Sequence, residues 1–186
     1  MSNANINSRT QKLAKMGLMT GIAVIFSFIH FPILPAAPFL EFEVSDIPII
    51  IAAFAFGPLP GLVIGVASIL LHDLMMGPAS GPYGMIMHII AIGVFVLVAG
   101  GIYEKAKGFQ SKKWGLAALI IGGLCMAGAM IPANLLITPH FMVTSVEFVK
   151  AMVLPVILPF NLLKMAINTA VVFVLYKRLS PFLHKW

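Results

Sequence analysis

One lysine lies in the middle of a long apolar segment, and its position indicates a binding site. Lys164 is about 12 residues from either end of the segment from Ala151 to Tyr176, or about 18 Å along a helix. A lysine side chain cannot reach the end of such a helix, so its ammonium group must face a polar cavity or a polar partner. Asn161 and Asn168 share its helical face, because the three residues follow an i, i+3, i+7 spacing. This face predicts a ligand-binding cavity, although a polar seam against a neighbouring helix would show the same spacing.

Further polar residues are expected near the outer end of the same cavity. They are His88, Asn134, Asp46 and Tyr83. Together with an ammonium group, an imidazole and amides would bind the carboxylate, hydroxyl and amide groups of a small ligand. Structural explanations stay open as well. His88 could bond a neighbouring helix, Asp46 in the sequence S-D-I-P could cap the following helix, and Tyr83 could be an interfacial anchor.

The sequence offers little for catalysis or metal binding. It contains no G-x-x-x-x-G-K-[ST] loop, no G-x-S-x-G elbow and no H-E-x-x-H helix. Its five histidines lack ligand spacing, and Cys125 is its single cysteine. We therefore predict no catalytic residues, no metal and no cofactor; an enzyme would need a nucleophile or metal that the sequence does not identify.

The composition places these residues in a membrane protein. Hydrophobic residues make up 60% of the 186 residues and charged residues 10%, whereas soluble domains have about 25% charged residues. We predict an all-α integral membrane protein that forms a single six-helix domain over residues 1–186. The second and third helices could instead form one broken re-entrant hairpin. The expected helices span about 13–31, 47–56, 62–76, 83–103, 114–137 and 151–176.

The charged residues predict the orientation of the chain, with both termini in the cytoplasm. Ten of the twelve basic residues then lie on the inner side: Arg9, Lys12, Lys15, Lys105, Lys107, Lys112, Lys113, Lys177, Arg178 and Lys185. Five acids lie on the outer side: Glu41, Glu43, Asp46, Asp73 and Glu147. The net charge of +6 therefore indicates topology and contact with anionic lipid of the bilayer. Nucleic acid is not an expected partner, because no aromatic platform separates the basic clusters.

The first predicted helix carries a face of small residues. Gly17 and Gly21 form a small-x-x-x-small pattern with Ala14 one turn before them. Such a face lets two membrane helices approach closely. It predicts either packing inside the bundle or docking to another membrane subunit.

Two stretches resemble a known family. FLEFEVSDIPIIIAAFAFGPLPG (39–61) and ILPFNLLKMAINTAVVFVLYKRLSPFL (157–183) are similar to the substrate-binding S-components of energy-coupling factor (ECF) vitamin transporters, and most similar to the riboflavin-type branch. The resemblance implies a protein of the prokaryotic plasma membrane that captures a vitamin from outside. It also implies a transmembrane coupling subunit and two ATPase subunits as partners, with Gly17 and Gly21 on the docking surface.

Departures from that branch bear on the substrate. Ser68 and Ile69 stand where flavin-type members usually carry a Lys-Asn pair, and His88 stands where they usually carry Asn. Both tryptophans are predicted on the cytoplasmic side, and Tyr83 is the one outward tyrosine, so aromatic stacking for a flavin is scarce. We therefore favour pantothenate, with Lys164 meeting its carboxylate. Riboflavin is the alternative, and a stand-alone secondary transporter is the rival from a different class.

Overall fold

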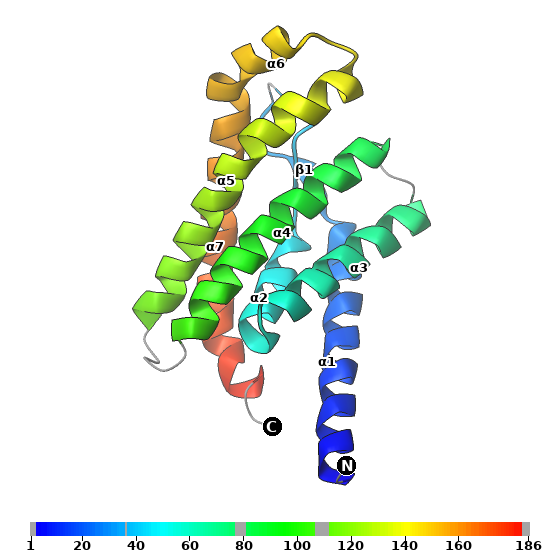
Figure 1. Cartoon of the computed structure of the whole chain (residues 1–186), viewed down its shortest axis with the longest axis vertical. Coiled ribbons are helices and arrows are strands. Elements are labelled where there is room, and N and C mark those ends of the chain that lie inside the picture. Colours follow the sequence, from blue (N-terminus) through cyan, green and yellow to red (C-terminus); the bar gives the residue numbers. More distant parts are fainter. Residues whose placement is uncertain (1–2, 36, 77–80, 107–111, 184–186) are drawn as a thin grey trace.

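The computed structural model describes residues 3–35, 37–76, 81–106 and 112–183 and shows an all-α membrane protein with one small hairpin (Figure 1). The helices are α1 (Asn3–Ser27), α2 (Asp46–Phe56), α3 (Pro58–Met76), α4 (Gly81–Lys105), α5 (Lys112–Met142), α6 (Val146–Met152), the π-helix η2 (Val153–Ile157) and α7 (Leu158–Leu183). The strands β1 (His30–Pro32) and β2 (Glu41–Glu43) pair in antiparallel fashion, with His30 opposite Glu43.

Four of the described helical segments are long and apolar enough to cross a bilayer. They are Pro58–Met76, Gly81–Lys105, Lys113–Met142 and Val146–Tyr176. The sequence predicts six helices of this kind, and α1 and α2 do not meet the same criterion. The first ten residues of α1 are mostly polar, and the 11 residues of α2 extend only about 16 Å along the helix axis.

Helix α2 forms the centre of the molecule. All its residues from Asp46 to Phe54 are buried, and it packs against α1, α3, α4 and α7. A turn at Gly57, whose φ of 105° favours glycine, leads from α2 directly into α3. Because α2 begins inside the bundle, its first residue, Asp46, is held among the other helices.

A π-helical turn precedes α7. The predicted helix from Ala151 to Tyr176 is divided at Val153–Ile157, which contains Pro155. Proline has no backbone N–H to donate, and π-turns accommodate such interruptions, often near functional sites. Helix α7 begins directly after this turn and carries Asn161 and Lys164.

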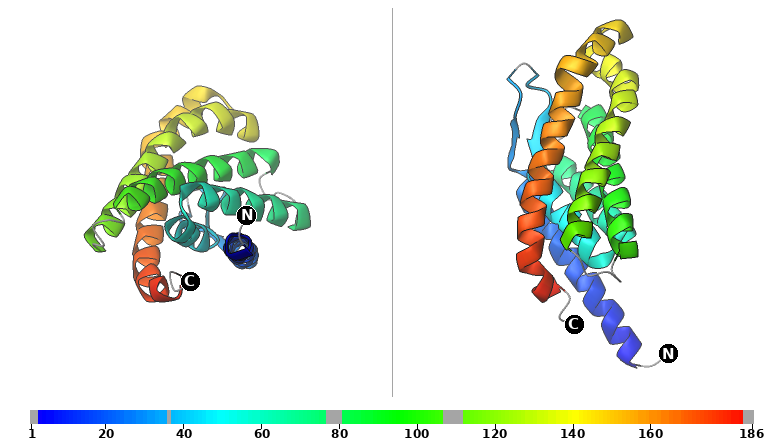
Figure 2. Two further views of the ribbon diagram at one scale, coloured as in Figure 1. Left: turned by 60° about the horizontal axis from the view of Figure 1, so that its bottom comes forward. Right: turned by 90° about the vertical axis from the view of Figure 1, so that its left-hand side faces the viewer.

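The beginning of α1 and the end of α7 lie at the same end of the bundle, as do the end of α4 and the beginning of α5 (Figure 1). The hairpin and α6 lie at the opposite end. Helix α1 lies at one side and extends beyond the other helices (Figure 2). Two of the basic residues used to predict orientation, Lys107 and Lys185, lie outside the described residues.

Candidate ligand-binding site

A cavity of about 150 Å³ lies between the hairpin and the helices α3, α4, α5 and α7. Five of the seven residues that the sequence predicts for ligand binding line it: Tyr83, His88, Asn134, Asn161 and Lys164. The other two, Asp46 and Asn168, are 1% and 0% exposed and do not line it. They contact each other, with Asn168 Nδ2 donating to Asp46 Oδ2 at 3.1 Å.

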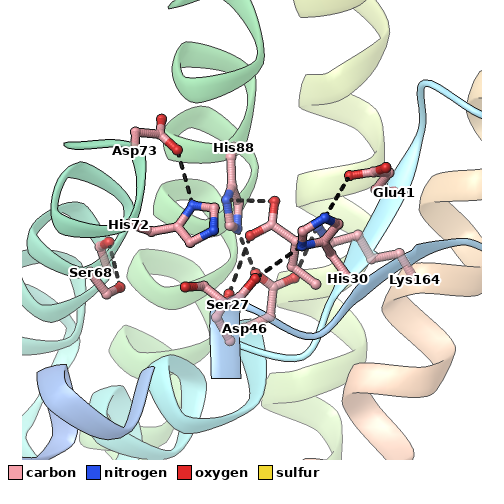
Figure 3. A network of polar contacts seen from close by, with 12 residues as sticks. Ser27, His30, Glu41, Asp46, Ser68, His72, Asp73, His88 and Lys164 are labelled. Carbon is pink, nitrogen blue, oxygen red and sulfur yellow. Dashed lines mark hydrogen bonds and ion pairs between the residues drawn. The ribbon is translucent and has the colours of Figure 1, made fainter. Parts of the chain in front are cut away.

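Asp46 joins three helices through its carboxylate. Its Oδ2 lies 3.0 Å from Lys164 Nζ on α7, and its Oδ1 lies 2.8 Å from His88 Nε2 on α4. Figure 3 shows both side chains converging on Asp46. The capping explanation for Asp46 is wrong, because Ser45 is the N-cap residue of α2. A charge this deeply buried needs partners of opposite charge. Asp46 contacts such partners on α4 and α7, which are distant from it in the sequence.

His88 also contacts a second acid. Its Nδ1 lies 3.1 Å from Glu43 Oε1 at the end of β2. Glu43, Asp46, His88 and Lys164 thus form a group of two acids and two bases, which we call the charge quartet. Burial raises the pKa of the Glu43 carboxyl, but attraction to His88 and Lys164 lowers it by more than burial raises it. The pKa of Glu43 therefore lies below its ordinary value of 4.5.

Two asparagine side chains are held by carbonyl groups one turn earlier in their own helices. Asn134 Nδ2 donates to Met130 O at 2.7 Å, and Asn161 Nδ2 donates to Ile157 O at 2.8 Å. Thr138 Oγ1 donates to Asn134 Oδ1 at 2.9 Å. Because each amide keeps further donor or acceptor capacity, both can also bond a ligand while their orientation stays the same.

A second polar group lies on the cavity wall and was not predicted from the sequence. His72 Nδ1 lies 3.1 Å from Asp73 Oδ1 on α3, and His30 Nε2 lies 3.9 Å from Glu41 Oε2 on the hairpin. The two imidazole rings are 6.3 Å apart, edge to face. The sequence shows only that these acids belong to the outer side. The hairpin register that brings His30 close to α3 depends on tertiary packing.

Phenylalanine side chains on the cavity wall were also not predicted from the sequence. Phe39, Phe141 and Phe160 line the cavity together with Tyr83. Tryptophan and tyrosine are scarce on the outer side, but phenylalanine rings also offer a flat face on which an aromatic ligand can stack. Aromatic surface for a flavin is therefore not scarce in this cavity, contrary to the expectation from the sequence. Ser68 and Ile69, where the sequence departs from flavin-type members, line the same cavity.

Comparison with known proteins identifies the family. Residues 11–176 match the family described as "ECF transporter, substrate-specific component". The chain belongs to this family. It is 30% identical to a riboflavin transporter RibU of Staphylococcus aureus, over 95% of this chain and 94% of that protein. It is 28% identical to the riboflavin transporter FmnP of Bacillus subtilis, over 95% and 96%.

A solved structure described as the S component of a bacterial ECF transporter has the same fold. The TM-score is 0.80 with 29% identity, and the match covers 95% of this S-component and 99% of that chain. The resemblance found in the sequence is thereby confirmed: the protein is a membrane-bound transport component and not itself an enzyme. Membership of this family also argues against a stand-alone secondary transporter.

The preference for pantothenate is not supported. The relatives above are named riboflavin transporters, which favours the alternative. A carboxylate on the vitamin is not needed to neutralise Lys164, because Asp46 lies 3.0 Å from its ammonium group. A sequence pattern on one helix shows that a lysine needs a partner but not whether the protein itself provides one.

The small-residue face of α1 points away from the bundle. Ala14, Gly17 and Gly21 are exposed, and a Cβ added to either glycine would meet no other atom within 4 Å. Leu18 and Ile25 beside them are 66% and 64% exposed. Packing inside the bundle is therefore not the role of this face in the described structure.

Proposed function

We propose that this S-component binds riboflavin in its outer cavity and delivers it inward with ATP-driven partner subunits. The observation that carries the proposal is the pairing of Lys164 with Asp46, within a charge quartet whose formal charges cancel. Among the described residues around the cavity, Lys164 is the only lysine or arginine. A ligand carboxylate would therefore find no unpaired lysine or arginine there, whereas a neutral vitamin needs none.

The chemistry of the cavity wall suits the two parts of riboflavin. Phe141, Phe160 and Tyr83 offer aromatic surface for the flat ring system. Asn134 and Asn161 offer amide groups for the polar edge of that ring. The hydroxyl groups of the sugar-like chain suit the carboxylates and imidazoles of the second polar group. Pantothenate would instead bring its own carboxylate toward these acids, and like charges repel.

Titration of the purified protein tests the substrate. Riboflavin is expected to bind with quenched flavin fluorescence, and pantothenate is expected to give no heat in a calorimeter. Pantothenate binding without riboflavin binding would refute the proposal.

Two asparagine variants test the site itself. Asn161→Ala should weaken riboflavin binding about fivefold, since one neutral hydrogen bond contributes about 1 kcal/mol. Asn168→Ala is the matched control, because Asn168 is buried in the same helix but does not line the cavity. If both variants weaken riboflavin binding equally, Asn161 supports the fold of the site and does not bond the ligand directly.

The same proposal includes topology and partners. Residues 1–186 form one six-helix domain with both termini in the cytoplasm, which agrees with the shared location of the ends of α1 and α7 (Figure 1). A transmembrane coupling subunit docks on the exposed face of Ala14, Gly17 and Gly21, and two ATPase subunits supply the energy. Close approach of helices across small residues supports this docking face.

A further inference from the structure

His88 holds two acids at once, one on each ring nitrogen. Its Nε2 lies 2.8 Å from Asp46 Oδ1, and its Nδ1 lies 3.1 Å from Glu43 Oε1. Ionised carboxylates only accept hydrogen bonds, so both contacts are hydrogen bonds when both ring nitrogens carry a proton. The geometry therefore calls for an imidazolium ion, and a ligand would find neither nitrogen free.

The contact with Glu43 attaches the hairpin to the helices. Glu43 is the last residue of β2, and β2 pairs with β1 alone among the described strands. A two-stranded hairpin is at best marginally stable without further packing. The hairpin and the loop between its strands nevertheless contribute His30, Phe39 and Glu41 to the cavity wall. The link from Glu43 to α4 is thus well placed to keep this wall closed.

We propose that His88 is a positioning residue that holds the hairpin closed over the cavity by bridging Glu43 and Asp46. It thereby sets how fast the ligand leaves, without serving as a hydrogen-bond partner of the ligand. The inference about ligand release rests on the proposed function, whereas the closure of the hairpin is a property of the unliganded protein. The two can therefore be tested separately.

Charge balance gives the bridge a specific signature. The charge quartet has two acids and two bases, so loss of either Glu43 or His88 alone leaves an uncompensated buried charge. Loss of both restores the balance, and at the hairpin it removes the same contact, between His88 and Glu43, that either substitution removes alone. The effects of the two substitutions on the hairpin should therefore not multiply, as is expected of residues that act as a pair.

Hydrogen–deuterium exchange of the unliganded protein tests the bridge. His88→Asn and Glu43→Gln should each speed exchange of the β2 amides about tenfold or more, because hydrogen bonds to charged groups are the stronger kind. The double variant should exchange no faster than His88→Asn alone. Glu41→Gln is the matched control, since Glu41 lies on the same strand but contacts His30 within the hairpin. Unchanged exchange in α4 and α5 shows that each variant keeps its fold.

Several outcomes would overturn the inference. They are wild-type exchange of β2 in both single variants, multiplied effects in the double variant, or an equal effect of Glu41→Gln. Glu43→Gln keeps the test decisive if His88→Asn fails to fold, because the Glu43 side chain is 25% exposed on the hairpin.

Stopped-flow release of riboflavin then tests the functional part. Release should be faster by the same factor as exchange in His88→Asn and Glu43→Gln. Faster release without faster exchange in the unliganded protein would make His88 a direct ligand contact and refute the positioning role. Absence of riboflavin binding in the wild type would refute the proposed function and leave the exchange result standing.

Discussion

Replacing Asp46 by asparagine removes one charge from the centre of the bundle while changing the shape of the side chain little. In the wild type the carboxylate faces three donors: His88 Nε2 at 2.8 Å, Lys164 Nζ at 3.0 Å and Asn168 Nδ2 at 3.1 Å. An asparagine amide has one oxygen to accept with, so its NH₂ group must face at least one of these donors. The charge quartet is then left with two bases and one acid.

The expected cost follows from these contacts. Hydrogen bonds to charged groups contribute about 1.5–3 kcal/mol each, and Asp46→Asn weakens all three that the carboxylate accepts. Removing one partner of a buried ion pair typically costs about 3–5 kcal/mol, because the other charge stays buried without compensation. We therefore expect Asp46→Asn to lower the free energy of unfolding by about 3–5 kcal/mol.

Reversible unfolding in detergent, followed by circular dichroism, measures this loss. Asp73→Asn is the matched control, since Asp73 is 16% exposed and contacts its chain neighbour His72. Asp73→Asn should lower the free energy of unfolding by less than about 1 kcal/mol, as is usual for ion pairs that stay partly solvated. In the double variant Asp46→Asn/Lys164→Met, part of the loss should be recovered, because no unpaired lysine remains.

Two results would contradict this expectation. In the first, Asp46→Asn lowers the free energy of unfolding no more than Asp73→Asn does; in the second, the double variant loses as much as the sum of its two single variants. Either result would mean that the buried pair between α2 and α7 does not hold these helices together.

Four further predictions concern other residues. A Cβ on Gly61 would lie 2.5 Å from the Cβ of Ala53, so Gly61→Ala should force α2 and α3 apart and cost about 1–3 kcal/mol in unfolding experiments. Gly101→Ala meets no atom within 4 Å and should be neutral or stabilising by up to about 1 kcal/mol. The pKa of Glu43 is lowered in the folded state, so its contribution to stability is full above the ordinary value of 4.5 and is lost as the pH falls through the lowered pKa. Glu43→Gln should therefore flatten the acid limb of a plot of unfolding free energy against pH, and an unchanged limb would contradict the assignment. Gly21→Leu should reduce co-purification with the coupling and ATPase subunits, whereas Gly128→Leu, at an equally open glycine of α5, should not; equal retention of the subunits by both variants would rule out the docking face.

Much of the architecture could be read from local composition. Helices α4 and α5 enclose the predicted spans 83–103 and 114–137, because an apolar run long enough to cross lipid has few other stable structures. The ends were harder to place. Helix α1 begins at Asn3, ten residues before the predicted start at Leu13, since a polar helix can continue beyond the hydrophobic layer without leaving any apolar signal.

The sequence predicted some of the polar residues that line the site and, apart from Tyr83, none of its aromatic residues. Lys164, Asn161, Asn134 and His88 stood out because a polar group in an apolar helix needs a partner, and the structure brings them to one cavity. Phenylalanines such as Phe160 gave no such signal. The sequence does not show whether an apolar side chain in an apolar helix faces lipid, the core or a ligand.

The composition alone shows that the chain is a membrane protein, because so many apolar side chains cannot be exposed to water. The sequence also shows that Lys164 needs a polar partner, because a charged ammonium group is costly to expose to lipid. Which group neutralises that lysine is visible only in the folded chain. Asp46 is separated from Asn168 by 122 residues and from His88 by 42, and no periodicity within one helix reports contacts over such separations. Because the protein supplies the counter-charge itself, the electrostatics of the cavity, and with them the expected vitamin, depend on the fold.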